Sequence, residues 1–146
     1  MLKFESLDAI AREVEMLARA REIRTLGNWS AGQNLAHVAL TMTRSLDGFP
    51  GNLPWVVRAM MGLLMKGYVL NKPMVPGFKA PKRAGLSAEA VSTEEGLARM
   101  RGALARMKVE PQRAPSPMLG KLSVEEWDRL HCRHAELHFS FLVPVE

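Results

Sequence analysis

The chain has 146 residues, of which 47% are apolar and 24% charged, and its formal net charge is +5. This length and balance fit one compact globular domain over 1–146 and exclude extended disorder. The net charge leaves an acidic ligand open, but the densest basic cluster, KAPKRAG at 79–85, lacks interleaved aromatic residues. The composition therefore does not favour a nucleic-acid-binding protein.

Cysteine usage and hydropathy indicate the compartment. The single cysteine, Cys132, excludes an internal disulfide and fits a reducing environment. The N-terminal segment has acidic residues where a signal peptide would be apolar. The most apolar run, 54–70, is interrupted by Arg58 and Lys66 and is short for a membrane span. We expect a cytoplasmic protein with no membrane span, in which this run is a buried or interfacial helix.

The first part of the chain predicts two long helices. Apolar residues repeat at helical spacing over roughly 6–24, and TLGN then breaks the pattern. Ser30 and Gln33 form a capping-box signature that starts a second helix, which is expected to end near Gly48.

Two further capping-box signatures start the later long helices. They pair Ser92 with Glu95 and Ser123 with Glu126, and a proline-containing linker separates the two helices. The last helix is expected to run through VEEWDRLHCRHAELHFSFL until Pro144 ends it.

An extra helix at about 54–70 and a loop at about 71–91 lie between the second and third long helices. We find no alternating strand pattern and no internal repeat. The simplest architecture is an all-α four-helix bundle with one long connection that contains the short extra helix.

Three of the four histidines lie in the segment HCRHAELH at 131–138. Projection of the last helix at ~100° per residue places one sector on the core side; it contains Trp127, Leu130, His134, Leu137, His138 and Phe141, with His131 at its edge. Histidines at i and i+4 stack on consecutive turns, so both rings can reach one ion. The pair alone leaves open a metal site and a chance pair of polar core residues.

A third ligand would have to come from another helix. His37 is the only remaining histidine, and it shares a side of the second helix with Asn34 and Thr41. Spacing leaves open whether this side faces solvent or a cavity.

NWSAGQNLAHVA (28–39), followed by EEWDRLHCRHAELHFSFL (125–142), resembles the DinB-like (YfiT-like) superfamily, in particular a branch of uncharacterised bacterial proteins. The likeness covers nearly the whole chain. Proteins of this superfamily form four-helix bundles that hold a divalent metal on one histidine from the second helix and an HxxxH pair from the last long helix. Carried over by position, the resemblance implies the ligands His37, His134 and His138.

The neighbouring polar residues receive other roles. His131 lies outside the triad and is expected either to orient a ligand from the second shell or to pack at the end of the bundle. Asn34 and Thr41 are expected either to line a pocket or to be solvated. Glu136 and Cys132 project away from the ligand side, so we expect a surface carboxylate and a thiol that is neither ligand nor nucleophile.

Three neutral imidazoles leave an open coordination position, and nitrogen ligands suit zinc, nickel or iron. The wider superfamily includes thiol transferases that use bacillithiol or mycothiol, and a maleylpyruvate isomerase. The resemblance therefore implies a metal-dependent thiol (S-)transferase or hydrolase that activates thiol or water, with a small-molecule substrate such as a low-molecular-weight thiol. Trp29 and Trp127 are expected to pack in the core rather than to form substrate platforms.

Two alternatives stay open. One is a non-catalytic metal- or ligand-binding bundle that acts as a dimeric binding or structural protein. The other is a bundle without a physiological metal, in which the AMMGLLM segment mediates a homodimer.

Overall fold

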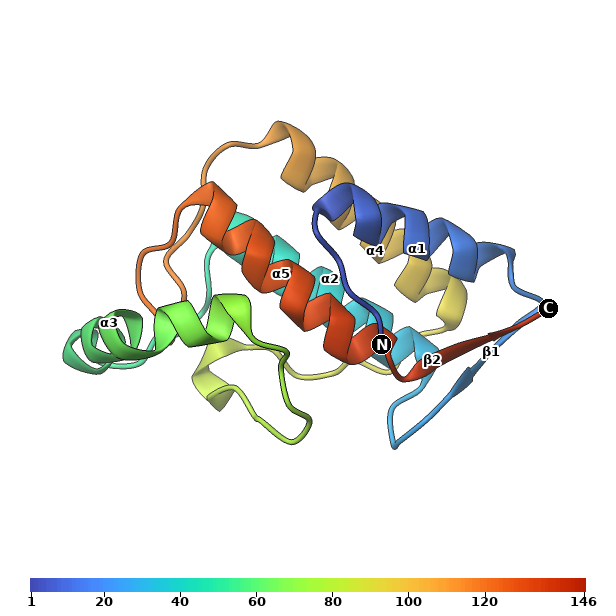
Figure 1. Cartoon of the computed structure of the whole chain (residues 1–146), viewed down its shortest axis with the longest axis horizontal. Coiled ribbons are helices and arrows are strands. Elements are labelled where there is room, and N and C mark those ends of the chain that lie inside the picture. The colour runs from blue at the N-terminus through green and yellow to red at the C-terminus, as the bar shows by residue number, and fades with distance from the viewer.

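The computed structural model describes residues 1–146 and is mainly helical (Figure 1). The elements follow in the order α1 (Leu7–Arg19), β1 (Glu22–Thr25), α2 (Ala31–Asp47), α3 (Trp55–Asn71), a 3-10 turn (Lys82–Ala84), α4 (Thr93–Val109), α5 (Val124–Phe139) and β2 (Leu142–Val145). The prediction of a mainly helical fold is confirmed.

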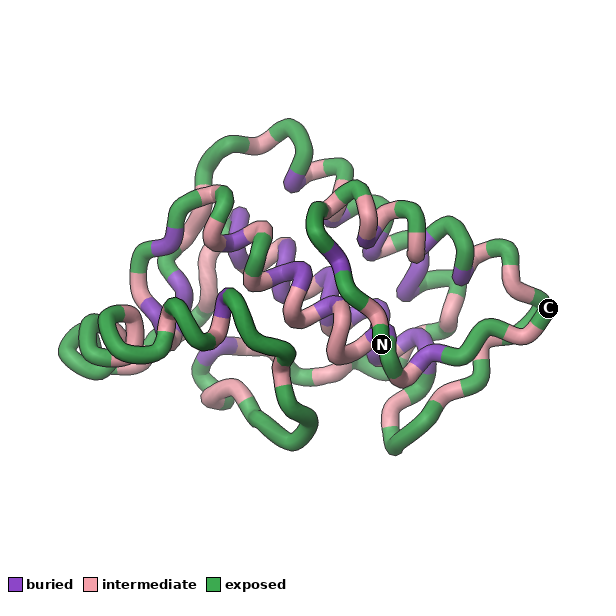
Figure 2. Tube along the Cα trace, in the orientation of Figure 1, coloured by how far each residue is buried: buried purple, intermediate pink, exposed green.

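One hydrophobic core joins α1, α2, α4 and α5. Helix α2 packs against α4 and α5, and α1 packs against the same two helices. Figure 2 shows the buried positions gathered on the facing sides of these helices. The core includes Ile10, Val14, Leu17, Leu35, Val38, Met42, Met100, Ala103, Met107, Ala135 and Phe139.

Local capping explains where the long helices begin. The Ser30 hydroxyl accepts a hydrogen bond from the backbone N–H of Gln33 at 3.1 Å, and the Gln33 side chain accepts one from the Ser30 N–H at 2.9 Å. Ser123 begins α5 in the same reciprocal way. At α4 the Ser92 hydroxyl caps the helix, but the Glu95 carboxylate binds Arg99 instead of returning to the cap.

The prediction of a first helix over 6–24 is wrong at its C-terminal end. Helix α1 ends at Arg19, and Glu22–Thr25 forms an antiparallel strand pair with Leu142–Val145. The two strands are about 120 residues apart in sequence, so a local search for alternation does not detect them. The expectation of no strand is therefore also wrong.

The strand pair also explains why the predicted C-terminal end of the last helix is wrong. Helix α5 ends at Phe139, three residues before the expected end, and the chain turns into β2. Pro144 does not end the helix but lies inside β2 opposite Ile23. Proline is tolerated there because both strands of a two-stranded sheet are edge strands.

Helix α3 forms where the sequence predicts it but packs mainly against α5. Leu70 is its one buried residue, so the helix is exposed along most of its length (Figure 2). No helix combines the length and the apolar character needed to cross a bilayer.

A close backbone approach fixes α2 against the start of α4. A Cβ atom at Gly32 would lie 2.0 Å from the Val91 carbonyl oxygen and 2.6 Å from that of Ser92. Gly96 lies across the same contact, where an added Cβ would be 2.9 Å from the Leu35 Cβ. Glycine at both positions lets the helices approach more closely than larger residues would allow.

Candidate metal centre

The structure brings together the three histidines singled out from the sequence. His37 comes from α2, whereas His134 and His138 come from consecutive turns of α5. Each offers one ring nitrogen to a group whose nitrogens all lie within 4.8 Å of one another. The Nε2 atoms of His37 and His134 are 3.2 Å apart, and the ring centroids of His134 and His138 are 4.7 Å apart.

These distances are compatible with a metal ion. Zinc binds imidazole nitrogen at about 2.0–2.1 Å, so two ligand nitrogens in a tetrahedral site lie about 3.3 Å apart. The observed 3.2 Å between His37 and His134 is close to that value. The group could therefore hold a divalent ion once all three nitrogens, which lie within 4.8 Å of one another, reach this separation.

A hydrogen-bond chain fixes the tautomer of His138. The Asn34 amide nitrogen donates to the backbone carbonyls of Ser30 at 3.0 Å and Trp29 at 3.4 Å, which leaves its oxygen facing His138. That oxygen is 3.1 Å from His138 Nδ1, so Nδ1 must carry the proton and donate it. The Nε2 lone pair of His138 is consequently free to bind a metal.

Trp29 forms one wall of the histidine group. Its indole stacks on His138 with ring centroids 5.4 Å apart and planes 9° apart, and it meets His37 edge-on at 5.1 Å. The expectation that Trp29 packs in the core is wrong, because the residue is only partly buried and its nearest ring partners are these imidazoles. Trp29 lies before the cap of α2, outside any helical pattern, so periodicity provides no signal for it.

The electrostatics favour neutral imidazoles. Burial lowers the pKa of His138 to about 3 and holds that of His134 well below its ordinary value, where the neighbouring histidines add to the effect. Burial also lowers the pKa of His37. The Leu86 backbone favours the protonated ring and so partly opposes this shift. Neutral rings keep the lone pairs that metal binding requires.

The structure separates the roles of Asn34 and Thr41. Both are buried, so neither is a solvated surface residue. Asn34 contacts His138 directly, whereas the Thr41 hydroxyl donates to the His37 carbonyl oxygen at 3.1 Å. Thr41 is thus bonded to the backbone of α2 rather than directed toward the ring nitrogens.

His131 is fully buried and belongs to a separate cluster. Its Nε2 lies 3.0 Å from the Ser45 hydroxyl, and its ring stacks on Trp127 with centroids 5.2 Å apart. Trp127 is 1% exposed, in agreement with the expected core position. Ser45 was not singled out from the sequence, because a serine within an apolar helix side has no distinguishing pattern.

Because His131 is buried, we expect the free energy of unfolding to decrease in acid. Burial lowers its folded-state pKa to about 3, whereas the unfolded chain titrates near 6.5, so the unfolded state takes up the proton first as the pH falls. Stability present above pH 6.5 is lost below it, by about 2 kcal/mol between pH 7 and pH 5. Urea unfolding in chelator should show this extra pH dependence in the wild type but not in His131→Gln. Equal pH dependence of the two proteins would contradict the assignment.

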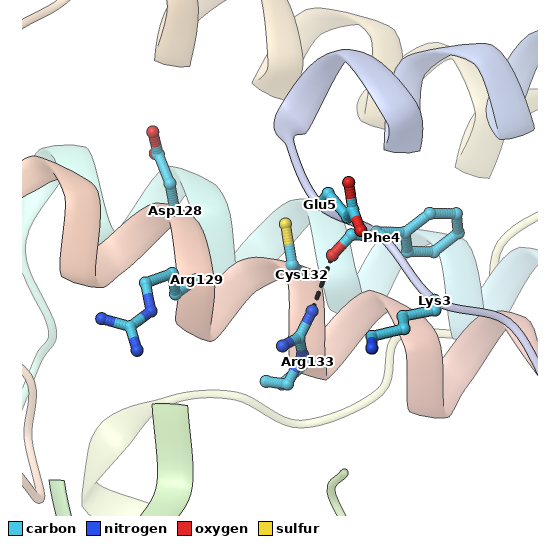
Figure 3. A pocket seen from close by; sticks show the side chains of 7 residues that line it. All are labelled: Lys3, Phe4, Glu5, Asp128, Arg129, Cys132 and Arg133. Carbon is cyan, nitrogen blue, oxygen red and sulfur yellow. Dashed lines mark hydrogen bonds between the residues drawn. The ribbon is translucent and has the colours of Figure 1, made fainter. Parts of the chain in front are cut away.

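The opposite side of α5 carries a cleft of about 150 Å³ (Figure 3). The prediction that Cys132 projects outward is wrong: the residue is 3% exposed and belongs to the core. Burial raises its thiol pKa to about 11, which still disfavours a thiolate near neutral pH. The expectation that Cys132 is no nucleophile therefore remains, for a different reason.

Glu136 is not the expected free surface residue. Its carboxylate accepts a hydrogen bond from the Phe4 backbone N–H at 2.7 Å and pairs with Arg133 at 2.6 Å. Arg133 also donates to the Phe4 carbonyl oxygen, the dashed contact in Figure 3. The N-terminal segment covers this side of α5, which the projection of an isolated helix cannot indicate.

The fold and site define a mainly helical protein with a partly buried three-histidine group compatible with metal binding. Over residues 1–145 the chain matches the family described as "Protein of unknown function (DUF1569)", and it belongs to that family. No curated protein and no solved structure matches the chain.

Proposed function

We propose that the protein is a DinB-like four-helix bundle that holds one divalent metal ion on His37, His134 and His138 and acts as a metal-dependent thiol (S-)transferase or hydrolase. The observation that carries this proposal is the convergence of three imidazole nitrogens within 4.8 Å from two helices. Three neutral imidazoles are the donor set of open zinc sites, and imidazole nitrogen also suits nickel and iron.

The packing supports the bundle assignment. Helices α1, α2, α4 and α5 contribute to one core, and α3 with the following loop forms the long connection between α2 and α4. The histidines occupy α2 and the last long helix, the two positions implied by the superfamily resemblance.

A metal ion with three nitrogen ligands would lower the pKa of a water or thiol at its open position. The chain's own residues would prepare this site. Asn34 holds the His138 ring with Nε2 unprotonated. Trp29 provides a partly exposed apolar wall beside His138, where a small-molecule substrate would lie.

Metal content tests the proposal directly. Protein purified without an affinity tag should contain about one equivalent of zinc, nickel or iron by elemental analysis, and chelation should lower its melting temperature. Fewer than a few tenths of an equivalent, with a melting temperature unchanged by chelator and by added metal, would contradict a metal site.

Activity separates the enzyme from a metal-binding protein. The loaded protein should be assayed with bacillithiol, mycothiol and related thiols against electrophiles, and with hydrolysable esters. Turnover that disappears in His134→Ala and His138→Ala would support chemistry at this site. Stoichiometric metal without turnover on either panel would favour the non-catalytic alternative.

Asn34→Ala should weaken metal binding without abolishing it. Loss of the acceptor for His138 Nδ1 frees the ring to rotate and to change tautomer, and such outer partners are worth about 10–100-fold in affinity. Competition with a chromophoric chelator measures the change. Thr41→Val is the matched control, since its hydroxyl binds the backbone, and its affinity should stay within about threefold of the wild type. A similar loss in both variants would contradict the role of Asn34.

A further inference from the structure

Helix α3 presents a broad exposed apolar surface. Leu63, Leu64 and Trp55 are 85%, 70% and 73% exposed. Figure 1 shows α3 projecting at the end of the molecule away from the chain termini, and Figure 2 shows it exposed along almost its whole length. We call the following residues the α3 surface: Trp55, Val56, Val57, Met60, Leu63, Leu64, Met65 and Tyr68. A contiguous apolar surface of this kind marks a contact with another apolar phase.

The positive charge of the protein is concentrated in the same region. Segment 48–88 contains six Lys and Arg residues and no Asp or Glu, whereas the whole chain has 20 basic and 15 acidic residues. The remainder therefore has 14 basic and 15 acidic residues and a net charge of −1. The excess positive charge therefore lies on α3 and in the loop that follows it.

A hollow of about 500 Å³ lies beside the α3 surface. Arg58, Lys66 and Lys121 line it, Leu63 borders it, and none of its eight lining residues is acidic. Lys66 also pairs with Glu126 at 2.9 Å, whereas Arg58 Nε is buried without a hydrogen-bond partner. Cations around a hollow that adjoins exposed aliphatic side chains can receive a phosphate oxygen while the neighbouring apolar groups enter hydrocarbon.

We propose that the α3 surface docks the protein onto membranes that contain anionic phospholipids. Interfacial helices combine an apolar surface with surrounding Lys and Arg residues, and each basic residue adds attraction to an anionic leaflet. A second copy meeting through the same surface would bring two strongly basic segments together, which is unfavourable. A nucleic acid would neutralise the charge but leave the aliphatic side chains in water.

This docking is independent of the metal centre. The three histidines come from α2 and α5, and α3 contributes none of them. Loss of metal binding should therefore leave membrane binding intact, and failure of either proposal can be recognised separately.

Vesicle sedimentation tests the proposal with the full chain. Wild type should sediment with vesicles of phosphatidylcholine that contain about one third phosphatidylglycerol. Its affinity for these vesicles should be at least tenfold higher than for vesicles of phosphatidylcholine alone. The emission of Trp55 should shift to the blue on binding, because this indole is 73% exposed in the free protein.

The decisive variant is Leu63→Glu/Leu64→Glu, which should weaken binding at least tenfold. Its matched control, Met16→Glu/Val109→Glu, adds the same charge at exposed apolar positions of α1 and α4 and should bind like the wild type within about threefold. Circular dichroism and melting curves should confirm that both variants fold. Replacing Lys72 and Lys79 by glutamine should weaken binding by about fivefold for each charge removed, and high salt should weaken it further.

Several outcomes would overturn the proposal. They are the absence of sedimentation with either vesicle, equal affinity for both vesicles, and equal losses in the two double variants. A homodimer in solution that the Leu63→Glu/Leu64→Glu change dissociates, without lipid binding, would assign the surface to a second copy. Retention on DNA without retention on vesicles would assign it to nucleic acid.

Discussion

His134→Ala is expected to remove stoichiometric metal from the protein. The three rings form a nearly equilateral triangle, in which the His134 centroid is 4.9 Å from that of His37 and 4.7 Å from that of His138. The His134 Nε2 atom is 3.2 Å from His37 Nε2. Structural zinc sites provide about 10–16 kcal/mol over four ligands, so loss of one ligand should weaken binding by about a hundredfold or more. Competition with a chromophoric chelator, together with elemental analysis after dialysis, measures the loss.

The matched control is another histidine of the same helix. His131→Gln removes an imidazole one turn earlier, but His131 Nε2 bonds Ser45 and lies outside the metal-compatible group. It should keep about one equivalent of metal with affinity within about threefold of the wild type. Melting curves in chelator should show that His134→Ala still folds. Metal retained by His134→Ala, or lost equally in the two variants, would contradict the triad.

Gly32→Ala is expected to destabilise the protein by about 3 kcal/mol or more, because the added Cβ would meet backbone rather than a movable side chain. The Val91 carbonyl oxygen would lie 2.0 Å from it, so the start of α4 would have to shift away from α2. The shift would also disturb the N-terminal part of α2, which carries Asn34 and His37. Urea unfolding in chelator measures the stability, and the metal affinity should fall with it.

The same substitution elsewhere should have the opposite effect. Gly102 lies on the exposed side of α4, where an added Cβ meets nothing within 4 Å. Gly102→Ala should therefore stabilise the protein by about 0.5–1 kcal/mol through helix propensity alone. If Gly32→Ala were as stable as Gly102→Ala, the close α2–α4 contact would be wrong.

The sequence alone determined features that depend on local chemistry. Capping hydrogen bonds span three residues, so Ser30 and Ser123 predicted where α2 and α5 begin. The i, i+4 spacing of His134 and His138 is likewise a property of one helix, and it indicated a shared side before the fold was known. His37 was added only through the resemblance, since its spacing allowed two orientations.

Tertiary structure decided everything that depends on distant neighbours. The ladder between β1 and β2 ended α1 and α5 earlier than helical periodicity suggested. The N-terminal segment buried Cys132 and engaged Glu136, which helix projection had placed in solvent.

The same distinction holds at the metal centre and at α3. Trp29 and Asn34 reach His138 only after α2 packs against α5. Helix α3 stays exposed because it packs mainly against one helix, α5. A sequence window records propensity and periodicity, but burial depends on which segments approach from far along the chain. That is why the histidine pair was visible in the sequence, while the groups that orient and enclose it became apparent only in the folded protein.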